Sequence, residues 1–180
     1  WHYRSEDERL IAFSNRHQDL YRSRLITAPS VTEKSPFVYH QVEGDFKDIS
    51  GKCPIAEIEK TVSLAIDHLK NNPNESLGVI ALGSDHARSI NKEFQRQSEN
   101  LSLQLWPENK PEEKFIIRHL ENVQGDERDV IFLSTGYGLR KHDAVRLDFG
   151  PINSDKNLFG LRRLNVAITR SRKRLEVIST

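Results

Sequence analysis

The sequence predicts an α/β domain with a mostly parallel β-sheet flanked by helices. Short apolar or β-branched runs alternate with segments whose apolar residues recur at helical spacing, giving about five strands and four helices. Residues 77–83 (LGVIALG) are apolar throughout, as expected for a strand buried on both faces of a parallel sheet. Ligands of such sheets bind at the carboxyl ends of strands, so we expect functional residues in the loops that follow strands.

The first half of the chain is predicted to contain two helices and two strands. Ser5 and Glu8 have the spacing of a capping box, which predicts a helix over 5–17. Residues 37–42 form a short β-favouring run before a polar loop. Apolar residues at helical spacing over 55–69 indicate the clearest amphipathic helix in the chain, and it precedes the buried strand.

In the second half, Ser84 and Asp85 are predicted to cap the next helix, and residues 136–160 have an irregular composition. The remaining predicted elements are a helix over 85–98, strands over 115–120 and 130–134, a helix over 161–172 and a strand over 175–179.

Length and composition exclude several classes of protein. A chain of 180 residues fits one domain, residues 1–180, which can bury a core without disulfides. The 27 basic and 26 acidic residues leave a net charge of +1, which excludes a uniformly basic nucleic-acid coat but not a local basic patch. One cysteine, Cys53, excludes an intramolecular disulfide and a cysteine-rich zinc site. The chain has no methionine and begins at Trp1, so we expect it to be a piece of a longer protein.

No membrane or targeting signal is present in the sequence. No apolar run approaches the roughly 20 residues that a membrane-spanning helix needs. With a single cysteine as well, the sequence predicts a cytoplasmic protein that does not act at a membrane, and no feature indicates an oligomer, so we expect a monomer.

The predicted helix over 161–172 and the residues just after it carry a cluster of positive charge. The cluster comprises Arg162, Arg163, Arg170, Arg172, Lys173 and Arg174. Arg163 and Arg170 are predicted to share one helix face, about 10.5 Å apart along the axis. Two planar guanidinium groups placed in this way suit a chain of phosphates. A solvated basic face is the alternative interpretation.

Two further segments contain candidate ligand-binding residues. Val123-Gln124-Gly125-Asp126-Glu127 precedes a predicted strand; its glycine permits a tight turn, and Glu127 can accept hydrogen bonds from a sugar hydroxyl. Arg4 lies just before the first predicted helix and can point into a cleft. An ordinary polar loop and a surface arginine are the alternatives for these two segments.

Several familiar sites are absent from the sequence. The seven histidines show neither HxxxH nor HExxH spacing, so no metal site is predicted. There is no GxSxG nucleophile motif and no GxGxxG fingerprint. There is also no GxxxxGK[ST] motif, so the chain lacks a phosphate-binding loop of its own.

Taken in order, the segments WHYRS, VQGDERDVIFLS and RRLNVAITRSRKRLEV resemble motifs IV, V and VI of superfamily 1 helicases. The resemblance is to the second RecA-like domain, in the branch of the RNA-surveillance and Okazaki-fragment-processing helicases. The run FIIRHLENVQGDERDVIFLSTGYG is most similar to large bacterial helicases of unassigned role. The resemblance covers nearly the whole chain and implies a RecA-like fold of the P-loop NTPase type.

This resemblance implies that ATP is bound between two RecA-like domains. The N-terminal RecA-like domain of the same chain would supply the phosphate loop and hold Mg²⁺, so the 180 residues alone are expected to be inactive. By the resemblance, Arg170 is the arginine finger of motif VI and Arg4 is its partner from motif IV. Arginine fingers stabilise charge on the transferred phosphoryl group.

The resemblance also assigns residues that bind the nucleotide and the nucleic acid. Glu127 would contact the ribose, with Gly125 and Gln124 in the same turn, and Arg163 would belong to the nucleotide site. Ser84 would contact a phosphate of single-stranded DNA or RNA. Relatives usually carry Thr or Ser where this sequence has His119, so a contact at His119 is not carried over.

Two other functions remain open from the sequence alone. The chain could be a catalytically degenerate α/β module that binds nucleic acid or another protein. It could also bind RNA or DNA through the basic helix alone, with a strong salt dependence and no coupling to ATP.

Overall fold

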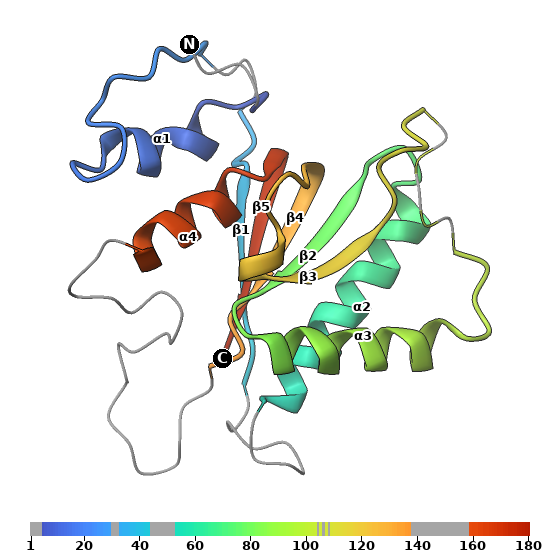
Figure 1. Ribbon diagram of the computed structural model, residues 1–180. Coiled ribbons are helices and arrows are strands. Elements are labelled where there is room, and N and C mark those ends of the chain that lie inside the picture. The colour runs from blue at the N-terminus through green and yellow to red at the C-terminus, as the bar shows by residue number, and fades with distance from the viewer. Residues whose placement is uncertain are drawn as a thin grey trace.

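The structure, a computed structural model, describes residues 5–29, 33–43, 53–103, 105, 107, 109–137 and 159–180. It confirms the predicted class, because the described strands form one all-parallel five-stranded sheet in the order β1-β5-β4-β2-β3 (Figure 1). The elements in chain order are α1 (Arg9–Arg16), β1 (Phe37–Gln41), α2 (Ile55–Asn71), β2 (Leu77–Ala81), α3 (Ser84–Ser98), β3 (Ile116–His119), the 3₁₀ turn η1 (Leu120–Asn122), β4 (Arg128–Ser134), α4 (Phe159–Ile168) and β5 (Ser171–Ser179).

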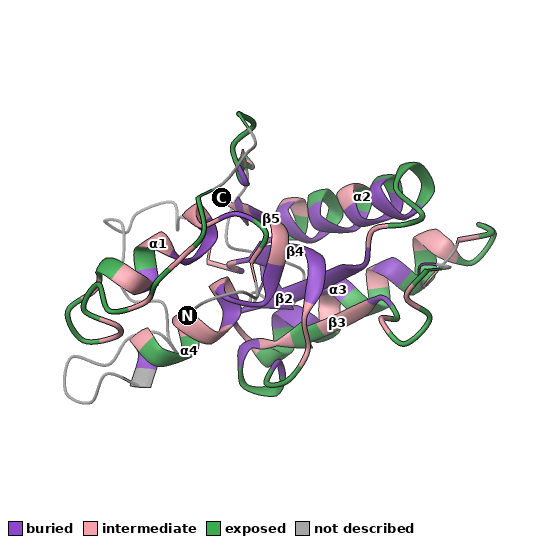
Figure 2. Ribbon diagram, turned by 90° about the horizontal axis from the view of Figure 1, so that it is seen from above, coloured by how far each residue is buried: buried purple, intermediate pink, exposed green. Residues whose placement is uncertain are grey.

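Helices cover both faces of the sheet, with α2 and α3 on one face and α1 and α4 on the other (Figure 1). The two central strands β2 and β4 are buried along their whole length (Figure 2). Alternate residues of a strand point to opposite faces, so Val79 and Phe132 pack under α2 and α3 whereas Ile80 and Ile131 pack under α1 and α4. This two-sided burial is the reason that both strands are continuous apolar runs in the sequence.

The predicted start of the first helix is wrong by four residues. Helix α1 begins at Arg9, and Glu8 occupies the N-cap position without a side-chain cap. The Asp7 carboxylate instead accepts a hydrogen bond from the Arg9 N–H at 2.9 Å and forms an ion pair with the Arg9 guanidinium at 2.6 Å. Asp7 therefore fulfils the role that the capping-box spacing had assigned to Ser5.

The last predicted helix is also shorter than expected. Helix α4 ends at Ile168, and residues 171–174, expected partly in the helix, belong to β5. Strand β5 lies between β1 and β4 and pairs with both, from Ser171 opposite Arg128 onward. The hydrogen bonds that β5 forms with β1 and with β4 outweigh the helical preference of the basic residues 171–174.

A buried ionic cluster closes the amino-terminal edge of the sheet. Asp129 is fully buried and accepts hydrogen bonds from Lys110 Nζ at 2.8 Å, Arg172 Nε at 3.1 Å and the Ser76 N–H at 3.2 Å. Burial acts to raise the pKa of Asp129, but these hydrogen bonds outweigh it and leave the pKa below its ordinary value. The cluster thus joins β4 and β5 to the segments before β2 and β3.

Within the described part of the chain, no helix combines the length and the apolar character needed to cross a membrane.

The stability of the domain is expected to depend on pH through His68. It is buried on α2, and burial lowers its pKa below the ordinary value of 6.5. The unfolded chain therefore binds more protons, so the free energy of unfolding should fall as the pH drops below about 6.5. Urea unfolding measured between about pH 7.5 and 5.5, above the range in which ordinary carboxylates titrate, should show this fall. We expect a smaller fall for His68→Gln, and an equal fall in both proteins would contradict the prediction.

Candidate functional site

The fold brings Glu127 and Arg170 together at the amino-terminal edge of the sheet. Strands β4 and β5 are neighbours in which Arg128 lies opposite Ser171, so the two residues that precede them also lie side by side. Arg170 Nη1 is 3.9 Å from Glu127 Oε1. Both residues precede their strands, whereas the sequence had led us to expect functional residues in the loops that follow strands.

The guanidinium of Arg170 is held in place by the end of helix α4. Its Nε donates a hydrogen bond to the Val166 carbonyl oxygen at 3.0 Å, and the Arg170 carbonyl oxygen accepts one from the Arg128 N–H at 3.1 Å. Arg170 is only 9% exposed. A cation fixed in this way at a surface edge is oriented before any anionic ligand arrives, which reduces the entropy lost on binding.

Arg163 does not share a helix face with Arg170. Arg170 lies beyond the last residue of α4, in the turn to β5, so the spacing of a single helix does not apply to the two residues. The Arg163 side chain is 43% exposed and forms an ion pair with Glu121 at 3.3 Å. Arg163 therefore faces the 3₁₀ turn η1 rather than the pair formed by Glu127 and Arg170.

A tight turn places Glu127 at the start of β4. Gly125 has φ +94°, a conformation that L side chains rarely adopt, although nothing lies within 4 Å of an added Cβ. The backbone angle, and not the available space, therefore requires glycine here. Val123 is fully buried and anchors the turn, whereas Gln124 is exposed. Arg4, the other predicted catalytic residue, lies outside the described residues.

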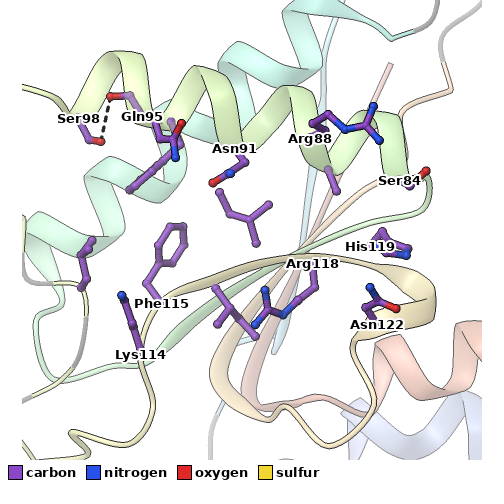
Figure 3. A pocket seen from close by; sticks show the side chains of 15 residues that line it. Ser84, Arg88, Asn91, Gln95, Ser98, Lys114, Phe115, Arg118, His119 and Asn122 are labelled. Carbon is purple, nitrogen blue, oxygen red and sulfur yellow. Dashed lines mark hydrogen bonds between the residues drawn. The ribbon is translucent and has the colours of Figure 1, made fainter.

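Ser84 lies at the opposite edge of the sheet. It follows β2 as the first residue of α3 and is exposed, so it does follow a strand as predicted. The N-cap is Gly83, without a side-chain cap, so the expected capping by Ser84 and Asp85 is wrong. Ser84 lies beside His119 at one end of a groove between α3 and β3 (Figure 3). Ser84 therefore lies at the opposite edge of the sheet from the pair formed by Glu127 and Arg170.

A buried polar network, which the sequence did not reveal, lies behind Ser84. Glu57, on the first turn of α2, is fully buried, and its carboxylate accepts hydrogen bonds from Ser134 Oγ and from the Gly136 N–H, both at 2.7 Å. His86, in the first turn of α3, has its Nε2 3.4 Å from Glu57 Oε1. The network therefore connects α2, the end of β4 and the start of α3.

The direction of the neighbouring hydrogen bond determines the role of His86 Nε2. The Ser134 hydroxyl gives its hydrogen to Glu57, so at 2.7 Å His86 Nε2 must donate to Ser134 Oγ. His86 Nδ1 is buried and has no hydrogen-bond partner in the described part of the chain. A Cβ at Gly136 would lie 2.7 Å from the His86 ring, so glycine is required for space and for its φ of +70°.

The local sequence contains no signal for this network. Glu57 resembles an ordinary acidic residue in the first turn of a helix, a position that favours acids for electrostatic reasons. Its burial arises from packing against the end of β4, about 80 residues further along the chain. Among the described residues, no three His, Cys, Asp or Glu side chains are grouped so that they could hold a metal ion.

An all-parallel sheet with helices on both faces is the RecA-like α/β class that the sequence predicted. Residues 2–180 match the AAA domain family, and the chain belongs to that family. It is 32% identical over 186 residues to the uncharacterized ATP-dependent helicase MG140 of Mycoplasma genitalium. It is 31% identical to the homologous protein of Mycoplasma pneumoniae. The predicted resemblance to a helicase domain is thus confirmed.

The alignments also show how much of the relatives this chain represents. Each covers all of this chain but only 16% of the relative, so the chain spans about a sixth of the length of the curated proteins it matches. A solved structure, the C-terminal domain of a possible DNA helicase from Lactobacillus plantarum, superposes with a TM-score of 0.45 at 10% identity. That superposition covers 80% of this chain and 72% of the other domain.

Proposed function

We propose that this chain is the C-terminal RecA-like motor domain of an ATP-dependent superfamily 1 helicase or translocase. The observation that carries the proposal is the fixed pair formed by Arg170 and Glu127 at one edge of the sheet. A neighbouring N-terminal RecA-like domain would face this edge and complete the nucleotide site. In this proposal the protein acts as a monomer in the cytoplasm.

The chemistry of the two side chains suits the two ends of a nucleoside triphosphate. The guanidinium of Arg170 offers a planar set of donors to phosphate oxygens, and it stabilises the charge that develops on the transferred phosphoryl group. The carboxylate of Glu127 accepts hydrogen bonds from the ribose hydroxyls, and the Gly125 turn lets the backbone approach closely. Arg4 is the proposed second arginine, and Gln124 and Arg163 are proposed to lie at the margin of the site.

In this proposal, catalysis also needs groups that the N-terminal RecA-like domain would supply. Mg²⁺ would neutralise phosphate charge and is proposed to be held by the first domain. Ser84 is proposed to donate its hydroxyl to a phosphate of single-stranded DNA or RNA, from the start of a helix, where anions are favoured.

The test is ATP hydrolysis by the full-length protein that contains this domain, with and without single-stranded DNA or RNA. We expect turnover to rise when single-stranded DNA or RNA is added. In this proposal the domain binds the nucleotide at one edge of the sheet and the nucleic acid at the opposite edge. The 180-residue chain alone should show no turnover, because it holds half of the site. Absence of turnover by the full-length protein with both strands would contradict the proposal and favour a degenerate binding module.

A further inference from the structure

A groove of about 710 Å³ runs along the outer edge of the sheet, between helix α3 and the edge strand β3. Its helical wall is formed by side chains spaced three or four residues apart, at Ser84, Arg88, Asn91, Gln95 and Ser98. This spacing places them on one face of α3, from its first residue to its last (Figure 3). With a rise of 1.5 Å per residue the wall is about 21 Å long, so the groove is elongated.

The charged side chains that face α3 in the groove are basic, and they lie beside apolar ones such as Phe94 and Phe115. Arg88 comes from α3, and Lys114 comes from the segment before β3. No aspartate or glutamate is among the side chains that line the groove in the described part of the chain. The excess of positive charge exists although the net charge of the whole chain is only +1. Such a local patch attracts anions without making the protein generally basic.

Arg88 can exchange its present partner for a ligand. It pairs with Asp85 at 2.8 Å, with side chains that are 76% and 50% exposed. An ion pair this exposed contributes little to stability, so a phosphate that binds in the groove replaces it at little cost. Arg118 of β3 points away from α3, on the face where its neighbour Ile80 packs under α1 and α4, and it pairs with Asp126 at 3.7 Å.

The shape and polarity of the groove select the kind of ligand. A long groove open at the sheet edge suits an extended chain better than a compact molecule. Asn91 and Gln95, one turn apart on the helical wall, offer amide donors and acceptors of the kind that bind base edges. Basic side chains together with polar amides therefore fit a sugar-phosphate chain with bases.

We propose that this groove binds single-stranded nucleic acid along α3 and β3, as a continuation of the contact at Ser84. Arg88 and Lys114 neutralise phosphates of the strand, and Asn91 and Gln95 face its bases. The inference rests on the proposed function and extends it, because it adds a binding track that runs from the carboxyl-terminal edge of the sheet toward Ser98 and Lys114.

The test uses a matched pair of arginines on the same helix. Arg88 and Arg96 both lie on α3, and both pair with an acid three residues earlier. Their side chains are 76% and 68% exposed, but only Arg88 lines the groove. Arg88→Gln and Arg96→Gln therefore make the same change in net charge, at a site inside and a site outside the proposed track.

Binding of a fluorescein-labelled oligothymidylate to the 180-residue chain is followed by fluorescence anisotropy over a series of low salt concentrations. Each phosphate contact with a single strand contributes about 0.7 to the slope of log K against log salt. We expect Arg88→Gln and Lys114→Gln each to weaken binding and to reduce the slope by about 0.7. The Arg96→Gln control should leave the slope unchanged.

The possible failures are distinguishable. If Ser84→Ala weakens binding but Arg88→Gln and Lys114→Gln behave like Arg96→Gln, the groove proposal is overturned and the contact at Ser84 stands. If the wild-type chain binds neither oligothymidylate nor oligouridylate, both the groove and the proposed nucleic-acid contact are overturned, whereas ATP turnover tests the nucleotide site separately. Equal binding of poly-glutamate, in which carboxylates replace phosphates, would overturn the assignment to nucleic acid.

Discussion

Replacing Arg170 with alanine is expected to lower ATP turnover by the full-length protein by about 10³- to 10⁵-fold. The guanidinium is held by the Val166 carbonyl oxygen and lies beside Glu127, so its position is fixed before the reaction begins. A preorganised cation stabilises charge in the transition state without the cost of reorganisation during the reaction. The measurement is steady-state ATP hydrolysis in the presence of single-stranded DNA or RNA.

The control for this prediction is Arg162→Ala. Arg162 is exposed on α4, so its loss removes the same charge from the same region with an expected change in stability within about 0.5 kcal/mol. Because Arg170 also binds α4, circular dichroism and thermal unfolding must show that Arg170→Ala is folded. Recovery of turnover on addition of millimolar guanidinium ion would separate a role in catalysis from a role in folding. A folded Arg170→Ala protein with the turnover of Arg162→Ala would overturn the assignment of Arg170.

The second large effect is expected for Glu57→Ala, which should lower the free energy of unfolding by about 2–6 kcal/mol, at about 1–3 kcal/mol for each of two buried donors left without an acceptor. The substitution removes the acceptor for the Ser134 hydroxyl and the Gly136 N–H, and with it the carboxyl group beside His86. Buried donors that lose their acceptor retain the full penalty of desolvation. Urea unfolding of the 180-residue chain at neutral pH, followed by circular dichroism, measures the loss.

Glu59→Ala provides the matched control for Glu57→Ala. Glu59 lies on the same helix but is exposed, so its removal should change stability by at most about 0.5 kcal/mol. Glu57→Gln keeps the shape of the side chain and one acceptor oxygen, so its loss should be intermediate and measurable even if Glu57→Ala does not fold. Equal midpoints for Glu57→Ala and Glu59→Ala would show that the buried carboxylate does not hold the end of β4.

The features that depend on local periodicity could be predicted from the sequence. The predicted helix over 55–69 and the buried run at 77–83 correspond closely to α2 and β2. Each has one dominant pattern, either a helical apolar stripe or a continuous apolar run, and no competing preference nearby. The α/β class follows from the order of these patterns along the chain.

The features that depend on tertiary pairing could not be predicted. The end of α4 at Ile168 is set by the pairing of β5 with β1 and β4, because local preference alone extends the helix to residue 172. That boundary removes Arg170 from the face that carries Arg163. Likewise, Glu127 and Arg170 meet because β4 and β5 are neighbours, and strand order is not encoded in the spacing of either segment. The resemblance to helicase motifs, rather than helix geometry, was the signal that singled out the pair.

Strand β4 gives the domain a mechanical property. It begins next to Glu127, ends at Ser134 in the Glu57 network, is buried throughout and is hydrogen-bonded to a neighbour on each side. At about 3.3 Å per residue, its ends are held roughly 20 Å apart. A buried strand that is paired on both sides does not stretch or bend appreciably, because the packed interior around it has low compressibility. Movement at the edge that carries Glu127 would therefore reach the opposite edge as a rotation of the whole domain, without internal rearrangement of the sheet.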